Sequence, residues 1–126
     1  MTRSSGILLP VSALPGPCGI GDLGTAAREF IDFLAAAGQR YWQILPLNPP
    51  DSAHSPYLSA STFAGSTDLL SPEPFMARGA LTLDEVRSVD WGGDPMRVDY
   101  GRVHAGKTAL LAAAFARVQA AVTPAL

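Results

Sequence analysis

The opening third of the chain constrains the fold most, because it carries the pattern strand, helix, strand. Gly6–Pro10 (GILLP) is a short apolar run closed by proline, which is typical of a buried parallel strand. Thr25 is the expected N-cap of the helix, and Gly38 is its expected C′ residue. Tyr41–Leu47 (YWQILPL) is rich in aromatic and branched residues and predicts the second strand. This order predicts a right-handed βαβ unit, and therefore an α/β fold. The helix face expected to carry the apolar residues consists of Leu23, Ala27, Phe30, Ile31 and Leu34.

Three glycines in the loop after the first strand have the spacing of a dinucleotide-binding motif: GIGDLG, from Gly19 to Gly24. In that motif the first glycine follows the strand directly, and an acid at the end of the second strand holds the ribose. Here Pro10–Cys18 separates the strand from Gly19, and the first acid after the second strand is Asp51, out in the next loop. Two of the three requirements fail, so we interpret the glycines as tight turns with close backbone approach.

The second strand is followed by a long loop and then by helices. Asn48–Leu70 is polar and lacks periodicity, and a loop of that length in a compact domain is usually functional. Thr82–Glu85 (TLDE) is a capping box that opens a short helix reaching about Ser88.

A final helix is expected to begin at Asp99 or Arg102 and to stop at Pro124. Its apolar stripe consists of Val103, Leu110, Leu111, Ala114, Phe115, Val118 and Val122. No convincing third strand follows in residues 71–126, so two parallel strands would leave two bare sheet edges. The chain therefore looks like the beginning of a larger α/β protein.

The composition excludes several classes of protein. The net charge of −2 shows no excess of basic residues of the kind that binds nucleic acid or an anionic membrane. Cys18 is the single cysteine, so no internal disulfide can form and a reducing, cytoplasmic location is expected. The apolar run near the N-terminus mimics a signal peptide, but Pro10 and Pro15 interrupt it, and we expect it to belong to the mature protein. No apolar stretch reaches the roughly 20 residues of a membrane span.

The chain carries four distinctive blocks in this order: RSSGILLPVSALPGPCGIGDLG, GQRYWQILPLNPP, SPYLSASTFAG and VDYGRV. Together they resemble the N-terminal portion of the 4-α-glucanotransferase family, also called amylomaltase or disproportionating enzyme. The similarity extends from about Arg3 to about Phe115. Joint agreement over these blocks is far more specific than the glycine spacing alone.

The resemblance implies that residues 1–126 are the N-terminal part of a (β/α)₈ TIM barrel with the start of an inserted subdomain. Residues 1–47 would be the first βαβ unit, 48–70 an active-site loop at the C-terminal face of the barrel, and 71–126 a mainly helical insertion. The implied reaction is retaining transfer of α-1,4-glucan segments between maltodextrins. The implied partners are the maltodextrin substrate and the remainder of the barrel, with no nucleic acid, no membrane, no metal and no organic cofactor.

Ser55 and Tyr57 match the family's substrate-binding residues. The resemblance implies that Tyr57 is a platform under the sugar at the cleavage point and that Ser55 lies beside it. The alternative from the residues alone is a Pro-Tyr turn whose ring packs the loop. Trp42, within the second strand, is interpreted as a core residue rather than a sugar platform.

No residue of the chain is expected to be catalytic. Retaining chemistry needs two carboxylates about 5 Å apart, and the resemblance implies that these acids and a third come from later strands. We interpret the acids at hand as solvated or capping groups: Asp22, Glu29, Asp32, Asp84 and Glu85. His54, His104 and Cys18 share no ligand spacing, so no metal site is expected.

The chain departs from the family pattern at Asp51–His54 (DSAH), where members commonly carry Gly-Tyr-Gly-Asp, and also at Leu58 and Ser66. Ser52 stands where some members carry an aromatic residue that supports a secondary glucan site. Two other classes of function remain open at this point: a non-catalytic carbohydrate-binding remnant that uses Tyr57, and a weaker dinucleotide-binding module.

Overall fold

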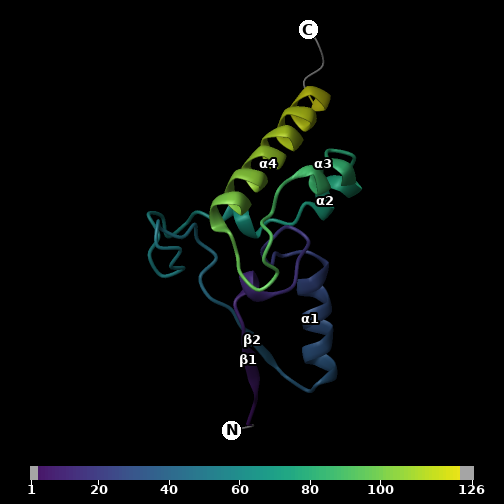
Figure 1. The fold of residues 1–126 in the computed structure, drawn as a ribbon. Coiled ribbons are helices and arrows are strands. Elements are labelled where there is room, and N and C mark those ends of the chain that lie inside the picture. The colour runs from purple at the N-terminus through teal and green to yellow at the C-terminus, as the bar shows by residue number, and fades with distance from the viewer. Residues whose placement is uncertain (1–2, 123–126) are drawn as a thin grey trace.

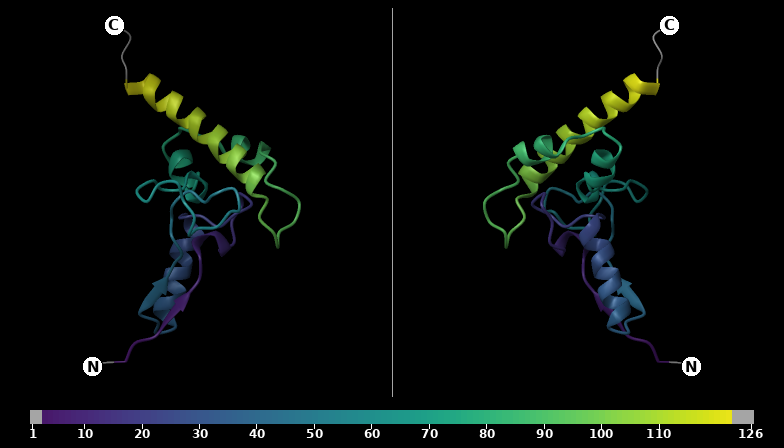
Figure 2. Two further views of the ribbon diagram at one scale, coloured as in Figure 1. Left: turned by 90° about the vertical axis from the view of Figure 1, so that its left-hand side faces the viewer. Right: turned by 90° about the vertical axis from the view of Figure 1, so that its right-hand side faces the viewer.

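A computed structural model of the chain describes residues 3–122. Strand β1 (Gly6–Leu8) pairs in parallel with β2 (Tyr41–Gln43), and Ile7 lies opposite Trp42. Helix α1 (Thr25–Ala36) connects the two strands and lies alongside them in each view (Figures 1 and 2). The strand–helix–strand order and the parallel pairing expected from the sequence are therefore present.

Both strands are shorter and more exposed than the sequence predicted. The expected strands 6–10 and 41–47 have only three paired residues each, and the ladder ends with Leu9 N donating to Gln43 O at 3.0 Å. Pro10 and Pro46 have no N–H group with which to extend it. The prediction of a buried strand is wrong for residues 3–122, where the sheet has no third strand and Leu8 remains 59 % exposed.

Helix α1 is capped from outside its own sequence. Thr25 is the first helical residue, not the N-cap as predicted, and Gly24 is the N-cap without a side-chain bond. The backbone N of Thr25 instead donates to Glu73 Oε2 at 2.9 Å, and its hydroxyl donates to the same oxygen at 2.8 Å. The predicted end is confirmed, since Gly38 follows the helix with a φ of +72°.

The apolar face of α1 is only partly buried. Ala27 and Leu34 are buried, and the ring of Phe30 meets Trp42 edge-on at 5.1 Å between centroids. Trp42 also donates from Nε1 to Leu9 O at 2.8 Å, which supports its interpretation as a packing residue. Ile31, predicted on the same face, is 50 % exposed.

A short 3₁₀ turn, η1 (Val11–Ala13), follows β1, and another, η2 (Thr67–Leu69), comes before the other half of the molecule, which is helical. Helix α3 (Leu83–Ser88) begins with the predicted capping box, in which Thr82 and Glu85 bond reciprocally. Helix α2 (Glu73–Ala77) was not predicted, and helix α4 (Tyr100–Val122) is the long helix of Figure 1. The core between these helices consists of Cys18, Ala80, Leu81, Val86, Leu110 and Ala114.

The apolar stripe of α4 is buried only as far as Ala114. Val103, Leu110 and Ala114 are buried, whereas Phe115 is 68 % and Val118 is 49 % exposed. The outer part of the stripe is uncovered, because the helix extends past α2 and α3 (Figure 1). The side chain of Val122 and the predicted stop at Pro124 lie outside the described residues.

The glycines of the first loop allow close backbone approach, as interpreted from the sequence. Gly19 has a φ of +70°, and a Cβ there would lie 2.5 Å from the carbonyl oxygen of Trp91. A Cβ on Gly21 would overlap the carbonyl oxygen of Val11. These glycines let the loop pack against the rest of the chain.

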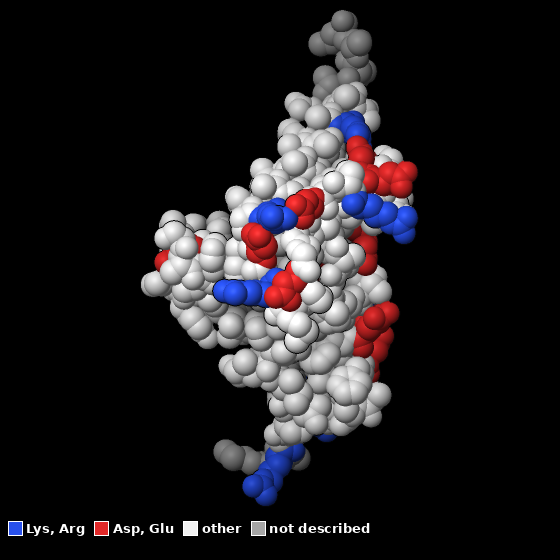
Figure 3. Space-filling model, in the orientation of Figure 1, with Lys and Arg blue, Asp and Glu red and all other residues white. Residues whose placement is uncertain are grey.

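Many charged side chains form pairs of opposite sign. In the middle and upper part of the face shown in Figure 3, basic side chains lie beside acidic ones, whereas the basic side chains at the lower end stand apart. The pairs include Arg28 with Glu73 and Arg102 with Asp90. None of the helices described between residues 3 and 122 is long and apolar enough to cross a membrane.

Candidate functional site

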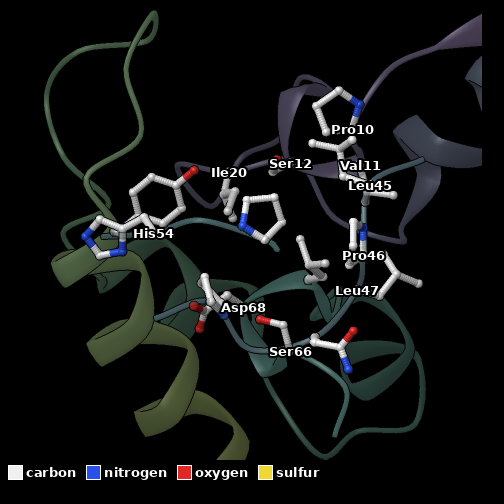
Figure 4. A pocket seen from close by; sticks show the side chains of 15 residues that line it. Pro10, Val11, Ser12, Ile20, Leu45, Pro46, Leu47, His54, Ser66 and Asp68 are labelled. Carbon is white, nitrogen blue, oxygen red and sulfur yellow. The ribbon is translucent and has the colours of Figure 1, made fainter. Parts of the chain in front are cut away.

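The loops that follow β1 and β2 leave the sheet at the same edge, because the strands are parallel. They enclose a cavity of about 240 Å³ whose lining includes Val11, Leu47, Pro56 and Asp68. Figure 4 shows Pro10, Val11 and Ile20 along one side of it, and Ser66 and Asp68 along the opposite side. Carboxyl ends of parallel strands are the usual location of binding sites in α/β proteins.

Residues 51–58 form a turn closed on itself. Asp51 N donates to Leu58 O at 2.9 Å, and Leu58 N donates to Ser55 O at 3.2 Å. The carboxylate of Asp51 accepts from the backbone N of Ala53 at 3.1 Å and from that of Ser55 at 3.2 Å. These bonds hold the backbone around Ser55 in one conformation.

The two predicted substrate residues lie within this turn. Ser55 Oγ accepts a long hydrogen bond from Tyr57 N at 3.4 Å. Neither Ser55 nor Tyr57 lines the cavity, although Pro56 between them does. Tyr57 is 70 % exposed, so its ring does not pack the loop as the alternative interpretation required. Their role in binding stays a prediction, and most of the Tyr57 side chain is open to solvent next in sequence to Pro56.

Asn48 anchors the second half of the loop, and sequence reasoning missed it. Its Nδ2 lies within hydrogen-bond distance of three carbonyl oxygens, those of Ser61, Thr62 and Ala64, at 2.8 to 3.1 Å. Ser66 N then donates to Leu47 O at 2.7 Å and brings the chain back to the strand exit. An asparagine directly after a strand is the available signal, since its amide readily bonds to loop backbone.

A buried ion pair joins the first loop to α4. Lys107 Nζ lies 2.9 Å from Asp22 Oδ2 and donates to Leu70 O at 2.6 Å, and the Lys107 side chain is 2 % exposed. Asp22 was expected to be solvated or capping. It does cap, by accepting from Gly24 N at 3.0 Å, but it is buried. The missed signal was a lysine within the apolar stripe of the last helix, between Val103 and Leu110.

The start of α1 is occupied by the protein's own carboxylates. Asp22 accepts from the backbone N of Gly24, and Glu73 accepts from that of Thr25. A pyrophosphate would need these N–H groups and would meet two negative charges there. The geometry therefore disfavours the dinucleotide hypothesis.

The remaining acids fit structural roles. Glu29, Asp32 and Asp84 are exposed. Arg117 and the Thr82 backbone, by donating hydrogen bonds, lower the pKa of Glu85 from 4.5 to about 2. A carboxyl with so low a pKa is not suited to act as a general acid near neutral pH.

The remaining nucleophile and metal candidates, Cys18, His54 and His104, have other surroundings or contacts. Burial raises the pKa of the Cys18 thiol, which disfavours the reactive thiolate. His104 Nδ1 lies 3.0 Å from Asp68 Oδ1, and the ring of His54 stacks on that of Tyr100. Within residues 3–122, no three His, Cys, Asp or Glu side chains are grouped so as to hold a metal ion.

Comparison with known proteins gives a consistent result. The family described as 4-alpha-glucanotransferase matches residues 9–125. A 4-alpha-glucanotransferase of Streptococcus pneumoniae is 42 % identical over 115 residues, which cover 91 % of this chain and 23 % of the relative. A 4-alpha-glucanotransferase of Thermus thermophilus is 45 % identical over 115 residues, which cover 91 % of this chain and 22 % of that relative.

A solved structure agrees with these relatives. The amylomaltase from Streptococcus agalactiae in complex with acarbose is 36 % identical to the chain, with a TM-score of 0.87. That match covers 91 % of this chain and 23 % of the amylomaltase. The chain thus spans about a quarter of the length of the relatives it matches. On the family match over residues 9–125, the chain belongs to the 4-alpha-glucanotransferase family.

Proposed function

We propose that the chain supplies the N-terminal part of an enzyme that transfers α-1,4-glucan segments between maltodextrins. The observation that carries the proposal is the family match across the whole turn that presents Ser55 and the exposed ring of Tyr57. Acarbose in the similar amylomaltase structure supports a carbohydrate substrate.

In the proposed architecture, β1 and β2 are the first two strands of a (β/α)₈ barrel. Residues 1–47 form the first βαβ unit, 48–70 the active-site loop, and 71–126 the start of a mainly helical insertion. The exposed apolar side chains of Ile7, Leu8 and Tyr41 support this, because neighbouring barrel elements would cover them. The remainder of the barrel is therefore the proposed partner.

Tyr57 is the proposed contact with the substrate. The C–H face of a pyranose is apolar, and an aromatic ring can cover it while the sugar hydroxyls stay free to form hydrogen bonds. Pro56 fixes its own φ and restricts Ser55, so the turn presents the ring at a defined angle. Because Ser52 carries no ring, no secondary glucan contact is proposed there.

The chain itself is proposed to contribute binding and not bond cleavage. Within residues 3–122, its carboxylates are exposed, bonded to backbone N–H groups or paired with a basic side chain. The nucleophile and the acid/base of a retaining mechanism would come from the rest of the barrel. No metal or organic cofactor is part of the proposal, and a reducing cytoplasmic location suits the buried Cys18 thiol.

A chimera tests the proposal. Residues 9–125 replace the matching segment in the full-length S. pneumoniae relative, and the product is incubated with maltotriose. The proposal predicts glucose and longer maltodextrins, whereas the relative with that segment deleted gives none. A folded chimera that binds maltodextrin without turnover would favour the binding-remnant alternative, and one that does neither would reject both.

A further inference from the structure

We propose that His54 is a positioning residue that fixes the Tyr57 turn against α4 through a ring stack on Tyr100. The proposal rests on the function proposed above. The two ring centroids are 4.3 Å apart and the rings are within 10° of parallel. Nothing in the sequence pattern pointed to this contact, which joins residues 46 positions apart.

The backbone of His54 is held in an unusual conformation. Among residues 3–122, His54 is the non-glycine residue with a positive φ, at +58°. Residues other than glycine are disfavoured at positive φ, so surrounding contacts must hold His54 in this conformation. His54 N donates to Asp51 O at 2.9 Å, and the ring stack holds the side chain.

Tyr100 gives the stack a fixed base. It is the first residue of α4, and Val103, three residues further on, has no exposed surface. Lys107 ties the same stretch of helix to Asp22 through the buried ion pair. A ring that stacks on Tyr100 is therefore held in a fixed position relative to the core of the chain.

His54 also lies at the junction of three hollows. The apolar cavity of about 240 Å³ and two more open hollows, of about 360 and 830 Å³, are all lined by His54 and Tyr100. In Figure 4, His54 stands at one end of the apolar cavity beside α4. Loss of the stack would join these spaces and release the turn that begins at Ser55.

The turn transmits the position of His54 to Tyr57. Ser55 follows His54 directly, its N donates to Asp51, and its Oγ accepts from Tyr57 N. Displacement of His54 therefore changes the angle of the Tyr57 ring. His54 acts on a bound sugar through Tyr57, without contacting it.

Kinetics in the chimera test this inference. His54→Asn removes the ring but keeps a side chain that tolerates positive φ, and Tyr100→Leu removes the other ring. An aromatic pair contributes enough for kcat/KM with maltotriose to fall roughly two- to tenfold in each variant. Tyr100→Phe keeps the stack and should restore most of the loss. Glu29→Gln, an exposed side chain on α1 that lines none of the three hollows, is the control and should leave kcat/KM unchanged.

A double-mutant cycle separates positioning from general stability. In a Tyr57→Ala background, His54→Asn should change kcat/KM by less than about twofold, because its effect passes through the missing ring. A full effect in that background, or Tyr100→Phe behaving like Tyr100→Leu, would overturn the inference.

Hydrogen exchange keeps the test independent of activity. In the folded chimera, the backbone amides of Ala53 and Ser55 should exchange roughly two- to tenfold faster in His54→Asn than in the parent or in Glu29→Gln. Equal exchange in all three proteins would refute the positioning role. An inactive parent chimera would reject the proposed function but still permit this measurement.

Discussion

The ammonium group of Lys107 lies 2.9 Å from the carboxylate of Asp22, and the two residues come from opposite ends of the chain. Both side chains are buried, at 2 % and 7 % exposure, and Lys107 also donates to Leu70 O. This contact fastens α4 to the loop after β1 and to Leu70, which lies beyond the long loop after β2. It is the chain's clearest link between its sheet half and its helical half.

Lys107→Met should destabilise the chimera by about 3–5 kcal/mol, because it leaves the Asp22 carboxylate buried without its counter-charge. Urea unfolding measures the free energy of unfolding. Adding Asp22→Asn should recover part of the loss, since the double variant buries no unpaired charge. A loss below about 1 kcal/mol for Lys107→Met would show that the pair is not buried in solution.

Gly19→Ala should lower the free energy of unfolding by more than about 1 kcal/mol. The residue has a φ of +70°, and the added Cβ would lie 2.5 Å from the Trp91 carbonyl oxygen. Gly93→Ala is the matched control, because a Cβ there meets nothing within 4 Å. Equal stability of the two variants would mean that the first loop does not pack as described.

Glu85 should contribute to stability in a pH-dependent way. Its pKa is lowered from 4.5 to about 2 by Arg117 and Thr82. The contribution is therefore fully present above pH 4.5 and is lost as the pH falls through about 2.

Urea unfolding between pH 6 and pH 2 checks this sign. Stability of the parent should fall more steeply on acidification than that of Glu85→Gln, whose side chain cannot titrate. Glu29→Gln, which removes an exposed carboxyl on α1, should follow the parent curve. Parallel curves for the parent and Glu85→Gln would contradict the assigned pKa shift.

Structural features that depend on neighbouring residues could be predicted from the sequence, whereas contacts between residues far apart in the chain could not. The capping box at Thr82 and the C′ glycine at Gly38 were predicted correctly, because each depends on a few neighbouring residues. The cap that Glu73 gives to Thr25 joins residues 48 positions apart, and no local pattern encodes it.

The strands were overestimated for a related reason. Apolar strand sequences predict burial only if neighbouring strands are present, and residues 3–122 supply a single pair. Ser55 and Tyr57 were predicted through resemblance to a family, and their role in binding stays a prediction. The loop contacts of Asn48 and His54 were not predicted, because each depends on where a loop returns in space.

The chain alone should not transfer glucan. Its acids are exposed, capping or ion-paired, and retaining transfer requires two carboxylates held about 5 Å apart. Purified residues 1–126 incubated with maltotriose should yield no glucose above a control without protein. Turnover that co-purifies with the chain would show that a catalytic pair was overlooked.

The central claim is that this chain handles glucan through Tyr57, and Tyr57→Ala in the chimera tests it most directly. Loss of one stacking ring, at about 1–3 kcal/mol, corresponds to a roughly 5- to 150-fold drop in kcat/KM. If the ring acts mainly on the distorted sugar of the transition state, kcat should fall at least as much as KM rises. Tyr57→Phe keeps the ring and should retain most of the activity, and the Tm of both variants should match the parent. Near-parental kinetics for Tyr57→Ala, or a loss that merely follows unfolding, would contradict the account.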